Sequence, residues 1–161
     1  MPNDRKPASG KRSLSTIEEK SEQAGEIAVQ LLNELMNFLA DRDPKSIEQI
    51  GRNNRILKTL ENTITEDCTK YISTSSLNAK QTRRIIAILK ISDRFTKIGS
   101  LIEETGSKVL TLPEISRENK LFSELFSLGN HSELVLRNSN KAFTQNNISI
   151  AYSVIANIND V

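Results

Sequence analysis

The most informative segment of the chain covers residues 81–106 and reads QTRRIIAILKISDRFTKIGSLIEETG. Its large apolar residues recur at alternating steps of three and four, which places one apolar stripe along a helix: Ile88, Ile91, Phe95, Ile98 and Ile102. Gly99 lies inside this stripe, where glycine costs about 1 kcal/mol relative to alanine. Because a helix tolerates that cost more readily where another backbone approaches closely, the segment predicts a tightly packed helix.

Two amphipathic helices are predicted before this segment. Ser15 and Glu18 have the spacing of a capping box, and the apolar face that follows reaches about residue 40. Asp43 and Pro44 then provide an N-cap and a proline at the first helical position. A second apolar stripe follows, in which Asn54 is the one polar interruption.

Sequence signals also bound the third helix. Asn78 is its predicted N-cap, and its end is expected between Gly106, as a C-cap, and Pro113, which cannot continue a helix. Three long helices joined by short links favour an up-down-up antiparallel bundle.

The remaining chain predicts two more helices. A fourth amphipathic stretch starts near Ser116, and we expect Gly129 and Asn130 to kink or split it. The closing segment NNISIAYSVIANINDV, residues 146–161, predicts a fifth, shorter helix. The expected fold class is therefore all-α.

Composition excludes several classes of protein. The formal net charge of +2 gives no general indication of nucleic-acid or membrane binding, and no apolar run approaches the ~20 residues that span a bilayer. The single cysteine, Cys68, excludes an internal disulfide and is interpreted as a small core residue. Residues 1–14 predict a disordered basic tail without the apolar region of a secretory signal. These features favour a cytoplasmic protein.

Enzymatic signatures are absent from the sequence. It contains no phosphate-binding glycine loop, no G-x-S-x-G and no H-E-x-x-H motif. The only histidine, His131, has no nucleophile placed beside it by any motif. We expect neither catalysis nor a cofactor.

The central segment resembles the third helix in the first repeat of PhoU-type phosphate-uptake regulators, which reads approximately L-K-I-x-x-D-L-E-R-I-G-D. Leu89-Lys90-Ile91 and Lys97-Ile98-Gly99 occur at the same separation without a gap. A faint internal repeat supports the resemblance, because Phe38 and Ile50 are echoed after about 105 residues by Phe143 and Ile155. The resemblance implies two copies of a three-helix unit. By that offset, roughly 54 residues of a full double repeat are missing, so the chain is a truncation or a fragment if the resemblance holds.

PhoU-type proteins carry E/D-x-x-x-D pairs on the second and third helices of each repeat, and these pairs bind iron or zinc clusters. The matching positions here are Asn54 and Lys58 on one helix and Thr96 and Ser100 on the other. None is a carboxylate, so we expect no metal site. An alternative role for Asn54 and Ser100 is a hydrogen bond across the core.

A basic stripe accompanies the apolar stripe of the third helix, and it consists of Lys80, Arg83, Lys90, Arg94 and Lys97. It could bind an acidic partner, or it could be a solvated face with local pairs such as Asp93 with Lys97. Binding of nucleic acid is not expected, because no second basic patch or set of stacking aromatics accompanies it.

We therefore expect three segments. They are the tail of residues 1–14, an antiparallel three-helix bundle over residues 15–112, and an incomplete second bundle of two helices over residues 113–161. The resemblance implies a non-enzymatic regulator of phosphate uptake and starvation signalling that contacts a phosphate transporter ATPase or a sensor histidine kinase. The partly covered second bundle also predicts self-association. The alternative is a helical adaptor or oligomerisation module unrelated to phosphate.

Overall fold

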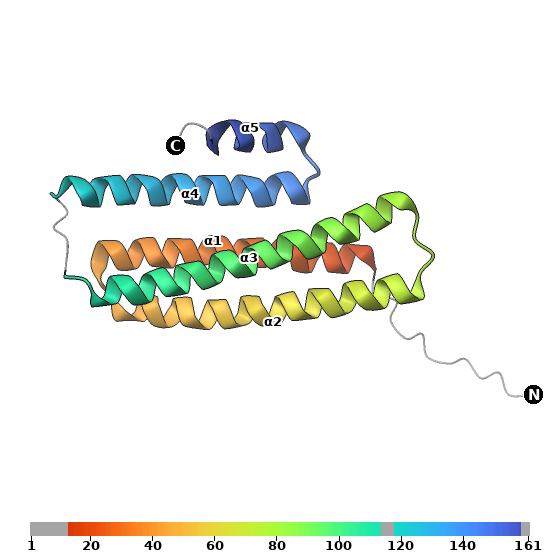
Figure 1. The fold of residues 1–161 in the computed structure, drawn as a ribbon, viewed down its shortest axis with the longest axis horizontal. Helices are drawn as coiled ribbons and strands as arrows, with labels where there is room; N and C mark the ends of the chain where they lie inside the picture. The colour runs from red at the N-terminus through yellow and green to blue at the C-terminus, as the bar shows by residue number, and fades with distance from the viewer. Residues whose placement is uncertain (1–12, 114–117, 159–161) are drawn as a thin grey trace, which may run out of the picture.

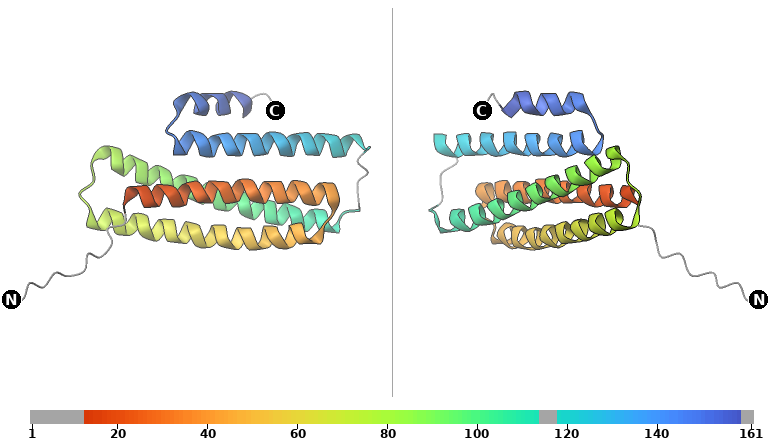
Figure 2. Two further views of the ribbon diagram at one scale, coloured as in Figure 1. Left: turned by 180° about the vertical axis from the view of Figure 1, so that it is seen from behind. Right: turned by 45° about the vertical axis from the view of Figure 1, so that its right-hand side comes forward.

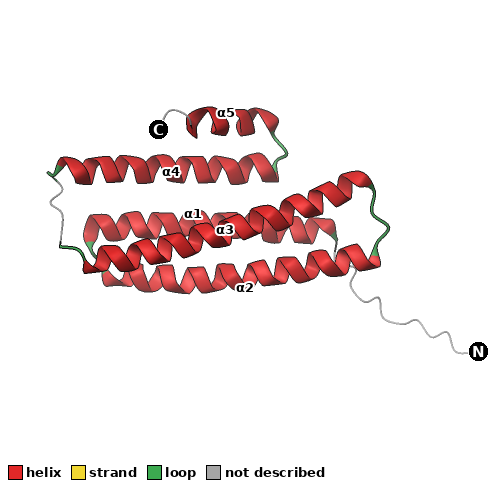
Figure 3. Cartoon of the chain, in the orientation of Figure 1, coloured by secondary structure: helices red, strands yellow, loops and turns green. Residues whose placement is uncertain are grey.

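Five helices account for nearly all of the chain that the computed structural model describes, which is residues 13–113 and 118–158 (Figures 1 and 3). No β-strand occurs in these residues, so the predicted all-α class is confirmed. The helices are α1 (Leu14–Asp41), α2 (Pro44–Thr74), α3 (Ala79–Thr111), α4 (Lys120–Thr144) and α5 (Ile148–Ile158). None of them combines the length and apolar character that a membrane span requires. Residues 1–12 of the predicted tail lie outside the described residues.

Helices α1, α2 and α3 form the main core (Figure 1). Helices α1 and α3 bury residues at alternating steps of three and four, the spacing that lets long helices pack side by side. The buried set of α1 on this side is Ile17, Ser21, Ala24, Ala28, Leu31, Leu35 and Phe38. The corresponding set of α3 is Ile85, Ile88, Ser92, Phe95, Gly99, Ile102 and Gly106.

The buried face of α3 differs from the predicted stripe in one respect. Ile88, Phe95 and Ile102 are buried as expected, but Ile91 and Ile98 are only partly buried. Small residues occupy the intervening core positions instead. At Gly99, an added Cβ atom would lie 2.7 Å from Oδ1 of Asn54 and 2.9 Å from Cδ2 of Leu57. The close approach expected at this glycine is therefore made by side chains of α2 rather than by a backbone.

The helix ends confirm two predicted caps and correct two others. The side chains of Asp43 and Asn78 cap α2 and α3, and Asn78 forms a full capping box with Gln81. For α1, however, the N-cap is Ser13, because its hydroxyl accepts a hydrogen bond from the Thr16 amide at 3.2 Å. Helix α3 ends at Thr111, within the interval predicted between Gly106 and Pro113, but Gly106 is not its C-cap. Gly106 instead faces the core, where an added Cβ atom would lie 3.1 Å from Cδ1 of Ile47, so the space at this position suits a very small residue.

Helix α4 lies along α1 on a different side from α2 and α3 (Figure 2). It runs unbroken through Gly129, so the predicted kink is wrong. Glycine is needed at position 129 because the side chain of Met36 occupies the space that a Cβ atom would fill. The side chain of Asn140 on α4 occupies the corresponding space at Gly25 on α1. Two glycines, one on each helix, thus let α1 and α4 pack closely. The predicted helix start near Ser116 lies outside the described residues.

Helix α5 packs antiparallel on α4, on the side away from α1 (Figures 1 and 2). Val154 is the residue that it buries, whereas Ile148, Tyr152 and Ile155 on its outer face are 71%, 69% and 58% exposed. The side chain of His131 lies 3.2 Å from the carbonyl oxygen of Asn157 and joins the two helices. The last helix is therefore anchored on one side only.

Arg84 links the first three helices to the α4–α5 turn. Its Nε donates to Glu18 on α1 at 2.6 Å, and its Nη1 donates to the Phe143 carbonyl and to Oδ1 of Asn146, each at 3.1 Å. The guanidinium also stacks over the Phe143 ring, 4.2 Å from the ring centroid. Asn146 has a positive φ of 49°, which asparagine tolerates better than most residues. One arginine thus fixes the position of this turn.

We predict that residues 13–112 fold without the rest of the chain. Their caps, their turns and nearly all of their buried core lie within that segment, and α4 packs along one side of α1 and contacts α3 at Arg84. Circular dichroism of this fragment is expected to show a mostly helical signal that is lost in one cooperative thermal transition. A gradual, non-cooperative loss of signal would place the boundary elsewhere.

The second fold prediction concerns Cys68. Its side chain is fully buried, and this burial raises the pKa of the thiol to about 11. The reactive thiolate is therefore scarce at pH 7–8. We expect no reaction of the native protein with a thiol reagent such as DTNB within minutes, and full reaction in denaturant. A Thr69→Cys variant, which places a thiol on the exposed side of the same helix, should react at once. Rapid labelling of native Cys68 would contradict its assignment to the core.

Candidate functional site

The predicted basic stripe lies on the surface of α3. Lys80, Arg83, Lys90, Arg94 and Lys97 are all exposed. Of these five side chains, only Lys97 forms an ion pair with another described residue. Its Nζ lies 2.8 Å from Oδ2 of Asp93. The local pairing foreseen for Asp93 and Lys97 is thus confirmed, but it neutralises one cation of the stripe only. The other four remain available to an acidic group.

An open apolar groove of about 810 Å³ runs beside this stripe. Its floor is α1 and its walls are α3 and α4, which both lie against α1 (Figure 2). The apolar residues that line it include Leu32, Leu35, Met36, Leu39, Ile91, Phe95, Ile98, Leu101, Leu125, Leu128, Val135 and Ile158. Ile91 and Ile98, which the sequence placed in the core, face this groove. The groove explains why they are only partly buried.

Charge is distributed unevenly around the groove. Arg94 is the only fully charged side chain that lines it, and its described lining contains no aspartate or glutamate. Lys90 lies one turn before Arg94 on the same side of α3. The stripe therefore forms a cationic edge along the α3 wall, whereas the α4 wall offers leucines together with His131 and Ser132.

The two α2 positions expected to replace metal ligands form a different polar cluster. Asn54 is fully buried, and its Nδ2 donates to Oε2 of Glu103 at 2.6 Å. The ammonium of Lys58 lies 3.7 Å from the same carboxylate oxygen. The core hydrogen bond proposed between Asn54 and Ser100 is therefore made to Glu103 instead, which is one turn further along α3. An amide and an ammonium already satisfy this carboxylate.

Thr96 and Ser100, the two α3 positions, lie in a shallow hollow with three carboxylates. Two of the three are already paired, because Asp93 binds Lys97 and Glu104 binds Lys108 at 2.6 Å. The hydrogen bond from Lys108 lowers the pKa of Glu104 and keeps it in the charged, paired form. The third carboxylate, Glu61, stands on α2 and accepts a hydrogen bond from Thr65.

These residues do not fit an iron or zinc cluster. Such clusters need several anionic or imidazole ligands that converge on the metal ion. The described residues contain no group of three or more His, Cys, Asp or Glu side chains placed to hold one. A lysine ammonium also has no lone pair for a metal ion while it is protonated.

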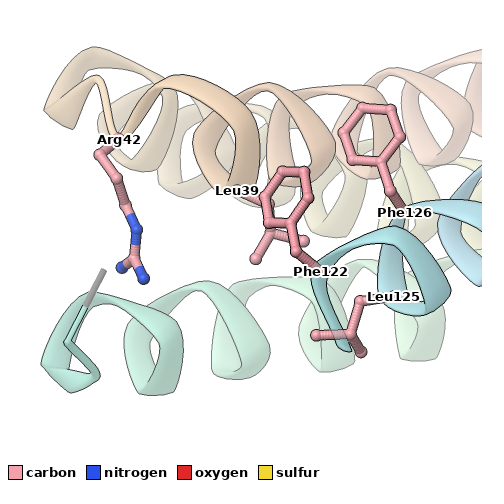
Figure 4. Close-up of a pocket in the computed structure, with 5 residues that line it drawn as sticks. All are labelled: Leu39, Arg42, Phe122, Leu125 and Phe126. Carbon is pink, nitrogen blue, oxygen red and sulfur yellow. The ribbon is translucent and has the colours of Figure 1, made fainter. Parts of the chain in front are cut away.

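A smaller pocket lies where α1 ends against α4 (Figure 4). It is lined by Leu39, Arg42, Phe122, Leu125 and Phe126, and its free volume of about 10 Å³ is roughly that of one water molecule. Arg42 is committed elsewhere, since Nη1 donates to the Val109 carbonyl at 2.7 Å and Nη2 to that of Pro113 at 3.1 Å. This arginine therefore ties α1 to the end of α3, and the pocket is too small for a ligand.

Sequence reasoning missed the groove, although one signal for it was present. Leu101 follows Ile98 and Arg94 on the outer side of α3, so the helix carries more large apolar residues than one core face needs. Its side chain is 62% exposed. The contributions of Leu125 and Leu128 depend on how α4 sits on α1, which the sequence does not specify.

Comparisons with known proteins give one match. The PhoU domain family matches residues 22–109, which is more than half of the 161 residues and falls on α1, α2 and α3. No curated protein and no solved structure matches the chain. The matched region includes the whole segment that carried the resemblance in the sequence.

We predict that the purified protein carries no stoichiometric metal. Protein prepared without chelator and passed through gel filtration should contain far less than one equivalent of iron or zinc by elemental analysis. Restoring the family pattern gives a matched variant with Asn54→Glu, Lys58→Asp, Thr96→Glu and Ser100→Asp. This variant should retain more metal than the natural chain if the two helices are in the expected register. Stoichiometric iron or zinc in the unmodified protein would overturn the prediction.

Proposed function

The chain belongs to the PhoU domain family, and on this basis we propose that it regulates phosphate uptake and phosphate-starvation signalling through contacts with other proteins. The family is regulatory and non-enzymatic. Within the described residues, the one histidine serves a helix–helix contact.

The observation that carries this proposal is the position of the family match. It covers α1, α2 and α3. These are the helices that supply most of the core and the whole basic stripe. The family's metal pattern is lost in the same region, so the proposed regulation depends on surface contacts and not on a bound cluster.

The proposed contact face is the basic stripe of α3, and the proposed partner is a phosphate transporter ATPase or a sensor histidine kinase in the cytoplasm. Support comes from the exposed and mostly unpaired cations of this stripe. Like charges on one helix face repel each other unless an acidic group neutralises them. An acidic surface on a partner would supply that neutralisation.

Deletion and complementation in the source organism test the proposal. Deleting the gene should raise phosphate uptake under phosphate-replete conditions, and the natural chain should restore normal uptake. A Lys90→Glu, Arg94→Glu variant should fail to restore it, because reversed charges repel an acidic partner. Its helical content and melting temperature should stay close to those of the natural chain, since exposed substitutions usually change stability by less than about 0.5 kcal/mol.

A matched control distinguishes an effect of charge reversal in the stripe from an effect of the change in net charge. The Lys45→Glu, Arg55→Glu variant makes the same change of net charge at exposed positions on α2. It should complement the deletion normally. Unchanged phosphate uptake in the deletion strain would contradict the proposed function. Equal complementation by both variants would instead show that the basic stripe is not the contact face.

A further inference from the structure

The groove between α3 and α4 has the properties of a binding surface rather than of a packing defect. Leu101 on one wall is 62% exposed, and Leu128 and Leu125 on the other are 50% and 38% exposed. Contiguous apolar surface of this kind is uncommon on a soluble monomer unless it binds something. The lining is almost entirely apolar, so the ligand must present an apolar face of its own.

Dimensions restrict the form of that ligand. The α3 wall extends from Ile91 to Thr105 and the α4 wall from Leu125 to Ser139. At 1.5 Å per residue, each wall is about 21 Å long. The two walls and the α1 floor are all helical, and the space between them is elongated. An additional helix of about four turns fits this shape, and its side chains would interdigitate with those of three neighbours.

Charge then specifies the chemistry of that helix. Arg94 lines the groove, Lys90 extends the cationic edge by one turn, and the described lining contains no carboxylate. We propose that this groove binds an amphipathic helix of a partner protein, with its apolar stripe against α1 and with glutamate or aspartate residues along the edge that faces α3. The inference rests on the proposed function, because it specifies the partner surface that the basic stripe contacts.

A second copy of the chain fits the groove less well. The described helix with the most exposed apolar face is α5, whose sequence ISIAYSVIANI contains no charged residue. If α5 of a second copy entered the groove, Arg94 and Lys90 would gain no acidic neighbour. The charge of the groove edge therefore favours a different protein whose helix carries acidic residues.

The probe for this inference is a synthetic peptide. A fluorescein-labelled helical peptide of about 18 residues, with leucines at every third or fourth position and glutamates along one flank, is titrated with the full chain. A matched peptide has lysines in place of the glutamates. Fluorescence anisotropy should show saturable binding of the acidic peptide, and its affinity should be at least about ten-fold higher than that of the lysine peptide, because two surface ion pairs give way to two repulsions.

Variants assign the binding to the groove. Leu101→Glu and Leu128→Glu place a charge on each apolar wall and should each weaken binding by ten-fold or more. Ile56→Glu is the matched control, since Ile56 is 53% exposed on α2, away from the groove. Arg94→Glu should reverse the preference between the two peptides, whereas Arg55→Glu should leave it unchanged. Circular dichroism of every variant confirms that the fold is retained.

Two outcomes would overturn the inference. One is equal binding of both peptides, or binding that Leu101→Glu and Leu128→Glu leave unchanged. The other is a dimer in sedimentation velocity that these two substitutions dissociate and the acidic peptide does not, which would assign the groove to a second copy. Both measurements use purified protein, so either result would leave the phosphate phenotype of the gene deletion intact as a separate test of the proposed function.

Discussion

The structure depends on the burial of α1 on two sides. One side packs against α2 and α3 through residues spaced by three and four, and another packs against α4. Helix α1 accordingly carries the small residues Ala24, Gly25 and Ala28 among its buried positions. Close packing of this kind needs small residues at the contacts. The remaining helices take their positions relative to α1, and α5, which does not touch it, is the least buried of them.

The same constraint creates the groove. Helices α3 and α4 both lie on α1 and meet each other at Arg84 and Phe143, but they do not pack against each other along the groove, so the apolar residues of their facing sides remain partly exposed there. The amphipathic face of α3 is wider than one packed interface needs. Its small residues, Ser92, Gly99 and Gly106, face the tight core, while Ile91, Ile98 and Leu101 face the groove. One helix thus serves stability with one part of its apolar face and leaves the other part available for binding.

The contact between α2 and α3 contains a polar cluster. The fully buried Asn54 donates from Nδ2 to Glu103, which also lies near Lys58, while Oδ1 of Asn54 is buried without a hydrogen-bond partner among the described residues. Burial of an unpaired polar group would cost roughly 1–3 kcal/mol, and the hydrogen bond to Glu103 offsets that cost for the amide nitrogen. Lys97 and Lys108 balance the nearby acids in the same manner.

The sequence by itself determined the helices and the positions at which α2 and α3 begin. Local signals act over a few residues, and so Asp43 and Asn78 identified their helices correctly, as did the resemblance carried by Leu89–Gly99. Tertiary structure decided which apolar residues are core and which line the groove. That choice depends on small residues such as Gly106 and Gly129, which the sequence suggested as a helix end and a kink but which lie at helix contacts. It also decided that Glu103, rather than Ser100, pairs with Asn54, because the relative shift of two helices is set by side-chain interdigitation along their whole length.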